Sequence, residues 1–546
     1  MLSLQTNLNP DLERLPREIW LECFSHVGFS DHKSIIQTCH YFYSLCLHLV
    51  FKKVSCSLSP PGPLSSLNLE DQVNRLLDNV EALAYSEKHA PLVTDLTVLY
   101  CDRYPGWRTA KTAVKIFDNI LHPRLVSRFL DLLPRFENLR VLHIDCGSNL
   151  DVEVLNTLSR MSELDILNFT SVSFGASTLS QGLRLKARKL KINNPWSALL
   201  EEYDPTESTG ILDIFSGEQL EHLTLLSTTY CPEILRSLTD QSNCTRLRFL
   251  CLDIQVKDTS VLIPFLVSCP EIETIDFTLR IPPSDSYGVP VPDTIPSYLQ
   301  LPDSALGNLR SISGPADMIV AFVPGRPIQD VTIKCERGHC GLYVGRYAPL
   351  GPALACLSQS TLPIKNLVVE ADASEKNLIN VITSNLPDLS LLQLHLQNRQ
   401  VPKQRLSDSI TGRLLQIANE MDDDVEPIGY YSKFMWDFVR DIKYMRIIHN
   451  IVLQKTYLPP NLEVLNIKNH PFSCFENTQH IDAKDVSTLG WYNFSAGRNI
   501  MGLLSQLYPS LREVTLMAGE DEPGSEAFSW YKPPGGKWCL RQSRRR

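Results

Sequence analysis

The densest group of potential metal ligands in the sequence is the segment Cys335–Cys340, which reads CERGHC. It brings two thiols and an imidazole, those of Cys335, His339 and Cys340, within six residues. A structural zinc ion takes four such ligands, which usually come in closely spaced pairs. No second Cys/His pair with a matching spacing accompanies this one in the sequence. We therefore expect no metal, and interpret the segment as a strand end followed by a turn at Gly338.

Two charge clusters have the composition of ion-binding sites but not the spacing. Asp422–Asp424 places three carboxylates in a row, whereas a calcium loop alternates its ligands and adds a glycine and a distal glutamate. We therefore predict a solvated acidic loop there. The segment Arg541–Arg546 carries four arginines and could serve as a nuclear signal or contact phosphate. The default prediction for such a segment is a solubilising, disordered end.

The sequence lacks the short motifs that position catalytic groups. It contains no GxxxxGK[ST] phosphate loop, no GxSxG nucleophile turn, no HExxH zinc motif and no Gly-rich dinucleotide turn. His143 and His395 alternate with apolar residues, which predicts outward strand positions where they could contact a ligand. No sequence pattern pairs either histidine with a nucleophile. We therefore expect a protein that has no catalytic site and no cofactor.

A repeated apolar pattern predicts the elements that carry these polar side chains. Its template is LxxLxL, with apolar residues at the first, fourth and sixth positions. Clear copies begin at Val93, Leu139, Leu164, Leu220, Leu247, Ile272, Ile328, Ile364, Leu389, Leu462 and Leu511, and weaker ones at Leu190 and Leu309. Several successive copies start 25 to 27 residues apart, as from Leu139 to Leu164 and from Leu220 to Leu247. This spacing falls within the period of leucine-rich repeats.

The pattern has a direct physical interpretation. In the LxL part a strand alternates, so the leucines face a core and the residues between them face outward. The segments between copies look helical, for example Pro123–Phe136 and Asp258–Ser268. One strand and one helix cannot bury their own apolar face, whereas stacked units share a continuous core. We therefore predict an α/β fold in which the strands form a parallel sheet on the concave side of a solenoid.

The beginning of the chain predicts a separate module of three short helices, within Leu15–Ser55. Pro16 suits the first turn of a helix, and Gly28 fits its end. Three side-chain sets are expected to face a common core: Ile19, Cys23, Phe24 and Val27; Ile35, Ile36 and Cys39; and Phe42, Leu45 and Leu49. About 40 residues bury too little surface to be comfortably stable alone. The module therefore needs a neighbouring domain or a partner.

This module resembles the F-box, and the repeats resemble those of F-box proteins with irregular leucine-rich repeats, which are numerous in fungi. The resemblance rests on the start at Leu15–Ile19, the pair Ile35 and Ile36, the junction Cys39–Phe42 and the exit Leu49–Val54. It implies substrate recognition for an SCF-type ubiquitin ligase. The F-box would dock a Skp-family adaptor, which tethers a cullin and a RING subunit, and the repeats would hold an unknown target protein. The adaptor-binding residues that we predict are Leu15, Pro16, Ile19, Phe24, Ile35, Ile36 and Phe42.

The sequence departs from the family pattern in two ways. The asparagine ladder of regular leucine-rich repeats is absent, so we expect irregular repeats. Phe51 stands where many F-boxes carry tryptophan. An alternative function is a non-enzymatic interaction scaffold, in which the F-box-like helices hold a Skp-type adaptor outside a cullin complex or only cap the solenoid.

The outward strand positions are the predicted target site. Their side chains are polar and varied, and short hydrogen-bonding groups on a rigid sheet favour recognition. The predicted contacts are Asp253, Asp276, Thr278, Thr332, Lys334, Glu370, Gln393 and His395. The Asp422–Glu426 segment is a possible secondary contact. The alternative is that loops at one edge, such as Pro282–Asp303 with its six prolines, bind the target while the sheet is only structural.

Charge and apolar content indicate which other partners and locations to expect. The net charge is −9, with 52 basic and 61 acidic residues, which argues against broad nucleic-acid binding. No apolar run is long enough to span a bilayer, and the start does not read as a signal peptide, so we expect a cytoplasmic or nuclear protein. The predicted domains are the F-box at 12–54, a linker and helix at 55–91, the repeats at 92–517 and a polar tail at 518–546. The repeats would carry an insertion at 398–461, with a helix near Ser432–Leu453.

Overall fold

The chain has a mixed α/β fold that divides into two compact units, Met1–Ile272 and Glu273–Arg546. The computed structural model describes residues 15–58, 66–100, 122–145, 149–150, 152–174, 184–193, 214–226, 230–241, 244–255, 259–280, 301–302, 304–334, 350–372, 377–397, 447–448, 450–470, 494–518 and 526–544. Within these ranges, no helix has both the length and the apolar character needed to cross a membrane.

Three helices open the first unit, at the positions that the sequence predicts. They are α1 (Arg17–Ser25), α2 (Phe29–Ile35) and α3 (His40–Phe51). Gly28, which the sequence places at the end of the first helix, is also the N-cap residue of α2. The helices share a small core around Phe24, Leu45 and Cys46.

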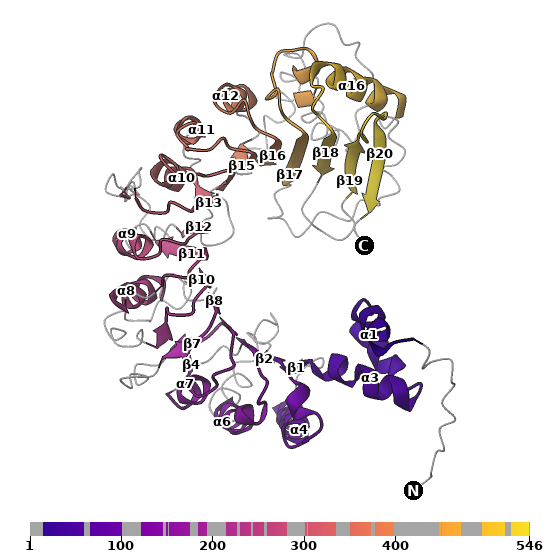
Figure 1. Cartoon of the computed structure of the whole chain (residues 1–546), viewed down its shortest axis with the longest axis vertical. Helices are drawn as coiled ribbons and strands as arrows, with labels where there is room; N and C mark the ends of the chain where they lie inside the picture. Colours follow the sequence, from indigo (N-terminus) through magenta and orange to yellow (C-terminus); the bar gives the residue numbers. More distant parts are fainter. Residues whose placement is uncertain are drawn as a thin grey trace, which may run out of the picture. The chain divides into compact units, whose positions relative to one another are not determined.

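Seven parallel strands follow in the first unit. Their order in the sheet is β1 (Lys53–Leu58), β2 (Asp95–Tyr100), β3 (Val141–Asp145), β5 (Ile166–Thr170), β8 (Lys189–Asn193), β10 (His222–Leu226) and β11 (Phe249–Gln255). One face of this sheet is lined by α4 (Ser66–Ala84), α6 (His122–Leu132), α7 (Val152–Ser159), α8 (Cys231–Gln241) and α9 (Thr259–Val267) (Figure 1). Short connecting elements are η2 (Ala90–Leu92), η5 (Leu133–Arg135) and the strand pairs β4 (Asn149–Leu150) with β6 (Ser173–Phe174) and β7 (Leu185–Lys186) with β9 (Phe215–Ser216).

The second unit repeats this arrangement. Its parallel strands are β12 (Thr274–Arg280), β13 (Ser311–Pro315), β14 (Asp330–Lys334), β15 (Asn366–Asp372), β16 (Leu391–Gln397), β17 (Val464–His470) and β18 (Glu513–Ala518). Its helices are α10 (Ala316–Phe322), α11 (Leu350–Leu357), α12 (Leu378–Asn385) and α16 (Phe494–Leu507). Neighbouring helices α10, α11 and α12 pack against one another in sequence order (Figure 1).

The last part of the chain corrects the sequence prediction. The segment 518–546 was expected to be a polar tail, yet it contains β19 (Glu526–Tyr531) and β20 (Cys539–Arg544). These strands form a hairpin that pairs antiparallel with β18. Arg541 and Arg544 therefore lie in a strand instead of a disordered end.

One turn geometry precedes the strand in most of the LxxLxL copies. The amide of the first apolar residue donates to the carbonyl three residues earlier, as Leu139 does to Phe136 at 3.0 Å and Leu511 to Tyr508 at 3.0 Å. This turn leads into the strand, where the fourth and sixth positions point into the core. The predicted alternation is confirmed: in β3, for example, Leu142 and Ile144 are buried while their neighbours are half-buried.

Several sequence predictions lie outside the described residues. These are the Cys335–Cys340 segment, the Asp422–Glu426 segment and nearly all of the proline-rich segment Pro282–Asp303. Of the predicted insertion, residues 398–446 also lie outside. The absence of metal at Cys335 and the loop contacts to a target therefore stay predictions.

Candidate adaptor-binding module and polar sheet face

The start of α1 presents apolar side chains to solvent. Leu15 is 45% exposed and Ile19 is 48% exposed, and Pro16 between them is also exposed. The Pro16 carbonyl accepts the amides of Ile19, at 3.1 Å, and Trp20, at 3.4 Å, which fixes this first turn. Large exposed apolar groups on a rigid turn are typical of anchors that a partner buries.

The other predicted adaptor contacts have a different position. Phe24 is only 7% exposed and packs with Trp20 and Phe42, at ring-centroid distances of 5.6 and 5.3 Å. Ile35 and Ile36 are partly buried against the same core. Of the seven predicted contacts, Leu15, Pro16 and Ile19 therefore form an exposed group, while the other four hold the helices together.

Two residues in this module were missed by the sequence interpretation. Trp20 lies over both Phe24 and Phe42, and its spacing of four residues from Phe24 on one helix was a usable signal. His32 is buried, and its Nε2 donates to the Phe24 carbonyl at 2.6 Å. This bond ties α2 to the end of α1, where the carbonyls lack helical partners.

Comparison with known families identifies the module. Residues 12–54 match the F-box domain. No curated protein matches the chain. F-box domains typically bind Skp-family adaptors, which supports that kind of partner for the exposed start of α1.

The F-box is joined to the sheet through its third helix. α3 ends at Phe51 and β1 begins at Lys53. The Lys52 carbonyl between them accepts the amides of Thr94 and Asp95, at 3.1 and 3.0 Å. The Phe51 ring also stacks on His89, with centroids 4.5 Å apart. The last helix of the F-box therefore continues directly into the first strand of the sheet.

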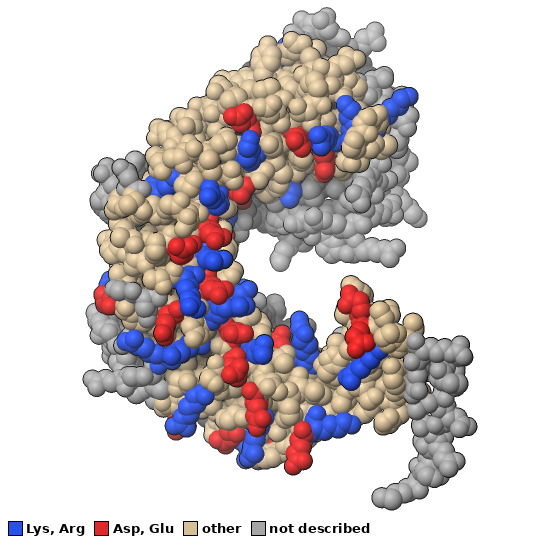
Figure 2. Space-filling model, in the orientation of Figure 1, with Lys and Arg blue, Asp and Glu red and all other residues tan. Residues whose placement is uncertain are grey.

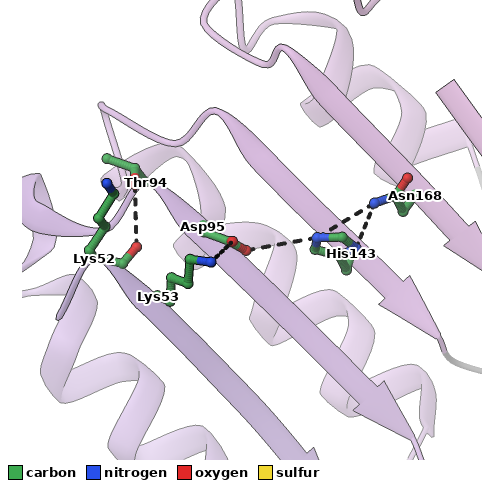
Figure 3. Close-up of polar contacts among 6 residues, drawn as sticks. All are labelled: Lys52, Lys53, Thr94, Asp95, His143 and Asn168. Atoms are coloured by element: carbon green, nitrogen blue, oxygen red, sulfur yellow. Dashed lines mark hydrogen bonds and ion pairs between the residues drawn. The ribbon is translucent and has the colours of Figure 1, made fainter. Parts of the chain in front are cut away.

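On the face of β1, β2, β3 and β5 that points away from the helices, polar side chains form a row across the strands (Figure 3). Lys53 Nζ lies 4.0 Å from Asp95, and Asp95 lies 3.9 Å from the His143 Nε2. Asn168 donates to the His143 Nδ1 at 2.7 Å. Burial lowers the pKa of His143, and the charges of Lys191 and Lys53 lower it further, while Asp95 opposes them. His143 is therefore a neutral hydrogen-bond acceptor at pH 7.

The second unit carries most of the predicted target-binding residues on the corresponding face. Lys334 and Asp276 form an ion pair in which both side chains are about one-third exposed or less. Glu370 lies opposite His395 in the register of β15 and β16, and the Gln393 amide contacts the His395 ring. Thr278 and Thr332 are half-buried at outward positions. Seven predicted residues therefore share one polar face: Asp276, Thr278, Thr332, Lys334, Glu370, Gln393 and His395.

Asp253 does not fit the predicted site. It lies at an outward position of β11, as predicted, but only 1% of its surface is exposed. It also belongs to the first unit, whereas the other predicted contacts belong to the second. An outward strand position is therefore not the same as an accessible one, and Asp253 is not available to a target.

The polar faces have the chemistry of recognition. Their side chains are amides, hydroxyls, imidazoles and paired charges, which offer directional hydrogen bonds. Among the described residues, no group of three or more His, Cys, Asp or Glu side chains could hold a metal ion. Lysine, arginine, aspartate and glutamate are interspersed on the surface shown in Figure 2, without a continuous basic region among the coloured residues.

Proposed function

We propose that the chain is the substrate-recognition subunit of an SCF-type ubiquitin ligase. The F-box would dock a Skp-family adaptor and, through it, a cullin, and the rest of the chain would bind a target protein. The observation that carries this proposal is the F-box at 12–54, whose Leu15 and Ile19 are exposed. On this proposal the chain itself catalyses no reaction.

We further propose that the repeated units form an irregular leucine-rich-repeat solenoid. Each repeat contributes a turn, one parallel strand and, in most cases, a helix on the same face of the sheet. Within each of the two compact units the strands are aligned without a shift in register. The first residues of β2, β3 and β5, for example, lie opposite one another: Asp95, Val141 and Ile166. Such stacking is the way in which repeats bury apolar faces that single units cannot cover.

The target would bind the polar sheet face. Seven of the predicted contacts support this proposal, because they lie together on β12, β14, β15 and β16. Rigid strands present their side chains with little loss of conformational freedom on binding.

Co-purification tests the proposal. The full chain is expressed with a Skp-family adaptor and a cullin, as wild type and as the double variant Leu15→Asp, Ile19→Asp. Removing residues 1–56 is a poorer test, because it also deletes most of β1. We expect the wild type to retain both partners and the double variant to lose both. The matched control is Leu503→Asp in α16, since Leu503 is 47% exposed but lies in the other unit.

The outcomes separate the two candidate functions. Retention of adaptor and cullin by the folded double variant would contradict docking through α1. If the wild type retains the adaptor but never the cullin, the chain is an interaction scaffold that acts outside a cullin complex.

A further inference from the structure

The outward face at β5, β8 and β10 in the first unit carries two lysines that have no ion-pair partner among the described residues. In the register, β8 lies between β5 and β10. The nine outward positions of these strands form what we call the β8 patch: Ile166, Asn168 and Thr170; Lys189, Lys191 and Asn193; and His222, Thr224 and Leu226. None of these nine residues is a carboxylate, whereas the whole chain has a net charge of −9.

The two lysines of the patch differ from the neighbouring cations. Lys186 lies 3.7 Å from Glu218, and Arg188 lies 3.7 Å from Glu221, so both are paired. In the part of the chain that the structure describes, neither Lys189 nor Lys191 has an ion-pair partner. Lys191 is exposed and Lys189 is half-buried, so neither residue is closed off from a ligand on this face.

Two imidazoles lie near these lysines, His143 beside the patch and His222 within it. Lys191 lies close enough to His143 to lower its pKa, although burial is the larger cause. Lys189 acts in the same way on His222, again after burial. Both histidines are therefore neutral near pH 7, where they add hydrogen-bonding capacity without adding charge.

We propose that the β8 patch binds an extended acidic segment of a partner protein, with carboxylates two residues apart opposite Lys189 and Lys191. This inference rests on the proposed function, in which the sheet face receives a target. Successive outward side chains of a strand are about 6.6 Å apart, because each residue rises about 3.3 Å. An extended peptide has the same spacing between residues i and i+2, so two of its carboxylates can match the two lysines.

The residue types favour carboxylates over other anions. Planar arginine forks are the usual partners of phosphate where bidentate recognition matters, and Arg188 at the border is already paired with Glu221. Single-stranded nucleic acids are held by basic grooves that also offer aromatic stacking, and none of the nine patch residues is Phe, Tyr or Trp. Asn168 and Thr224 beside Lys191 supply the uncharged hydrogen-bonding groups that an extended peptide backbone can use.

Fluorescence anisotropy with labelled peptides tests the inference on the full chain bound to its adaptor. The probes are a glycine-serine peptide with two glutamates at i and i+2, one with them at i and i+3, a singly phosphorylated serine peptide and an oligouridine. Each peptide or oligonucleotide is measured with the wild type, with the double variant Lys189→Glu, Lys191→Glu, and with the single variant Lys468→Glu as control. Lys468 is a half-buried lysine on the outward face of β17, in the other unit.

We expect the i, i+2 peptide to bind the wild type and the Lys468→Glu control equally, and the double variant about tenfold more weakly. Binding should also weaken as salt is raised from 50 to 300 mM, because exposed charges are screened. The inference is wrong if no peptide binds, if the double variant binds as well as the wild type, or if the phosphopeptide or the oligouridine binds while the acidic peptide does not. Retention of the adaptor by the double variant shows that such a failure leaves the F-box function untouched.

Discussion

At the scale of single residues, the F-box separates side chains that bind from side chains that stabilise. Leu15 and Ile19 are almost half exposed, whereas Phe24 lies in the core with Trp20 and Phe42. Leu15, Ile19 and Phe24 are apolar residues within ten positions of one another, so hydropathy alone assigned them one role. Their burial separates two roles: Leu15 and Ile19 are available to a partner, whereas Phe24 stabilises the helices.

This division predicts opposite effects for two alanine variants. Phe24→Ala should cost about 3–5 kcal/mol of unfolding free energy, because it empties a buried ring site. Leu15→Ala should cost less than about 0.5 kcal/mol and weaken adaptor binding about tenfold or more. Urea denaturation and calorimetric titration with the adaptor measure the two quantities. Equal loss of stability in both variants would contradict the division.

Gly314 is a second residue whose surroundings restrict which side chain can stand there. It occupies an inward position of β13, where neighbouring strands carry larger apolar residues such as Phe277, Ile333 and Val369. A Cβ built on it would lie 3.0 Å from the Phe277 Cβ on the adjacent strand, so the phenylalanine fills the space of both positions. Gly314→Ala should therefore destabilise the second unit by about 1–2 kcal/mol.

A compensating variant checks this explanation. Leucine at 277 keeps the Cβ but removes the ring, whose Cδ2 would lie 3.5 Å from the added Cβ, so the 277 side chain has room to shift away. Phe277→Leu combined with Gly314→Ala should therefore be more stable than the sum of the two single changes predicts, as a double-mutant cycle measures. Strict additivity would show that the two sites do not share space.

At the scale of elements, Arg326 connects the loops around α10. It is buried, and its guanidinium donates to the carbonyls of Ala305 at 3.2 Å, Phe322 at 3.2 Å, Pro324 at 2.9 Å and Pro302 at 3.2 Å. A planar group with five donors can satisfy several carbonyls that secondary structure leaves open. Arg326 therefore acts as a crosslink between the turn before β13 and the end of α10.

Replacing Arg326 tests its role as a crosslink. Arg326→Met should destabilise the second unit by about 3 kcal/mol, since the buried carbonyls lose their donors. Arg326→Lys should recover only a part, because an ammonium group cannot reach the same set of carbonyls. Thermal unfolding of the three proteins gives the order; a lysine variant as stable as the wild type would show that charge matters more than the fork.

The strands were predictable from sequence because their cause is local. The alternation in the LxL part of the template places the inward residues, and the turn before most of these strands uses the same three-residue spacing, although Ile328 donates to Arg326 instead. The β19–β20 hairpin was missed because Pro533, Pro534, Gly535 and Gly536 were interpreted as a tail. They are the turn of the hairpin, and Gly535 has the positive φ of 69° that such a turn requires. The flanking strands do not follow the LxxLxL template; they are defined by pairing, β19 with β18 and β20 with β19.

The candidate site was less predictable than the fold. Alternation correctly placed Asp253 on the outward side, but its burial depends on what covers β11, which no local pattern contains. Whether Lys189 and Lys191 find an ion-pair partner among the described residues likewise depends on side chains from other strands. Sequence gives the side of a sheet, whereas accessibility and pairing are properties of the assembled structure.

At the scale of the whole molecule, the first unit should be sensitive to acid. His48, His89, His143 and His222 all lie in this unit, and burial is the main reason why the pKa of each is lowered. The unfolded chain therefore binds more protons than the folded one once the pH falls below about 6.5. Stability is complete above that pH and is lost as the pH falls toward the folded pKa values.

Urea denaturation between pH 7.5 and 5.0 measures this dependence. The unfolding free energy should fall over that range, and His143→Gln should reduce the slope, because glutamine keeps a hydrogen-bonding group for Asn168 but cannot be protonated. An unchanged slope in the variant would remove His143 from the set of responsible groups.

The β19–β20 hairpin also has a consequence for the solution behaviour of the protein. The main chain of β18 is paired on one side with β17 and on the other with β19, from Glu513 to Met517. A shorter chain that stops at Ala518 would leave that second row of amides and carbonyls open, and an open strand edge is a template for another chain. Such a chain should self-associate, with a light-scattering mass that rises with concentration, whereas the complete chain should not dimerise through this strand. The hairpin thus moves the open edge of the sheet from β18 to β20, a strand that contains Arg541 and Arg544, and charged residues on an edge strand oppose pairing with another chain.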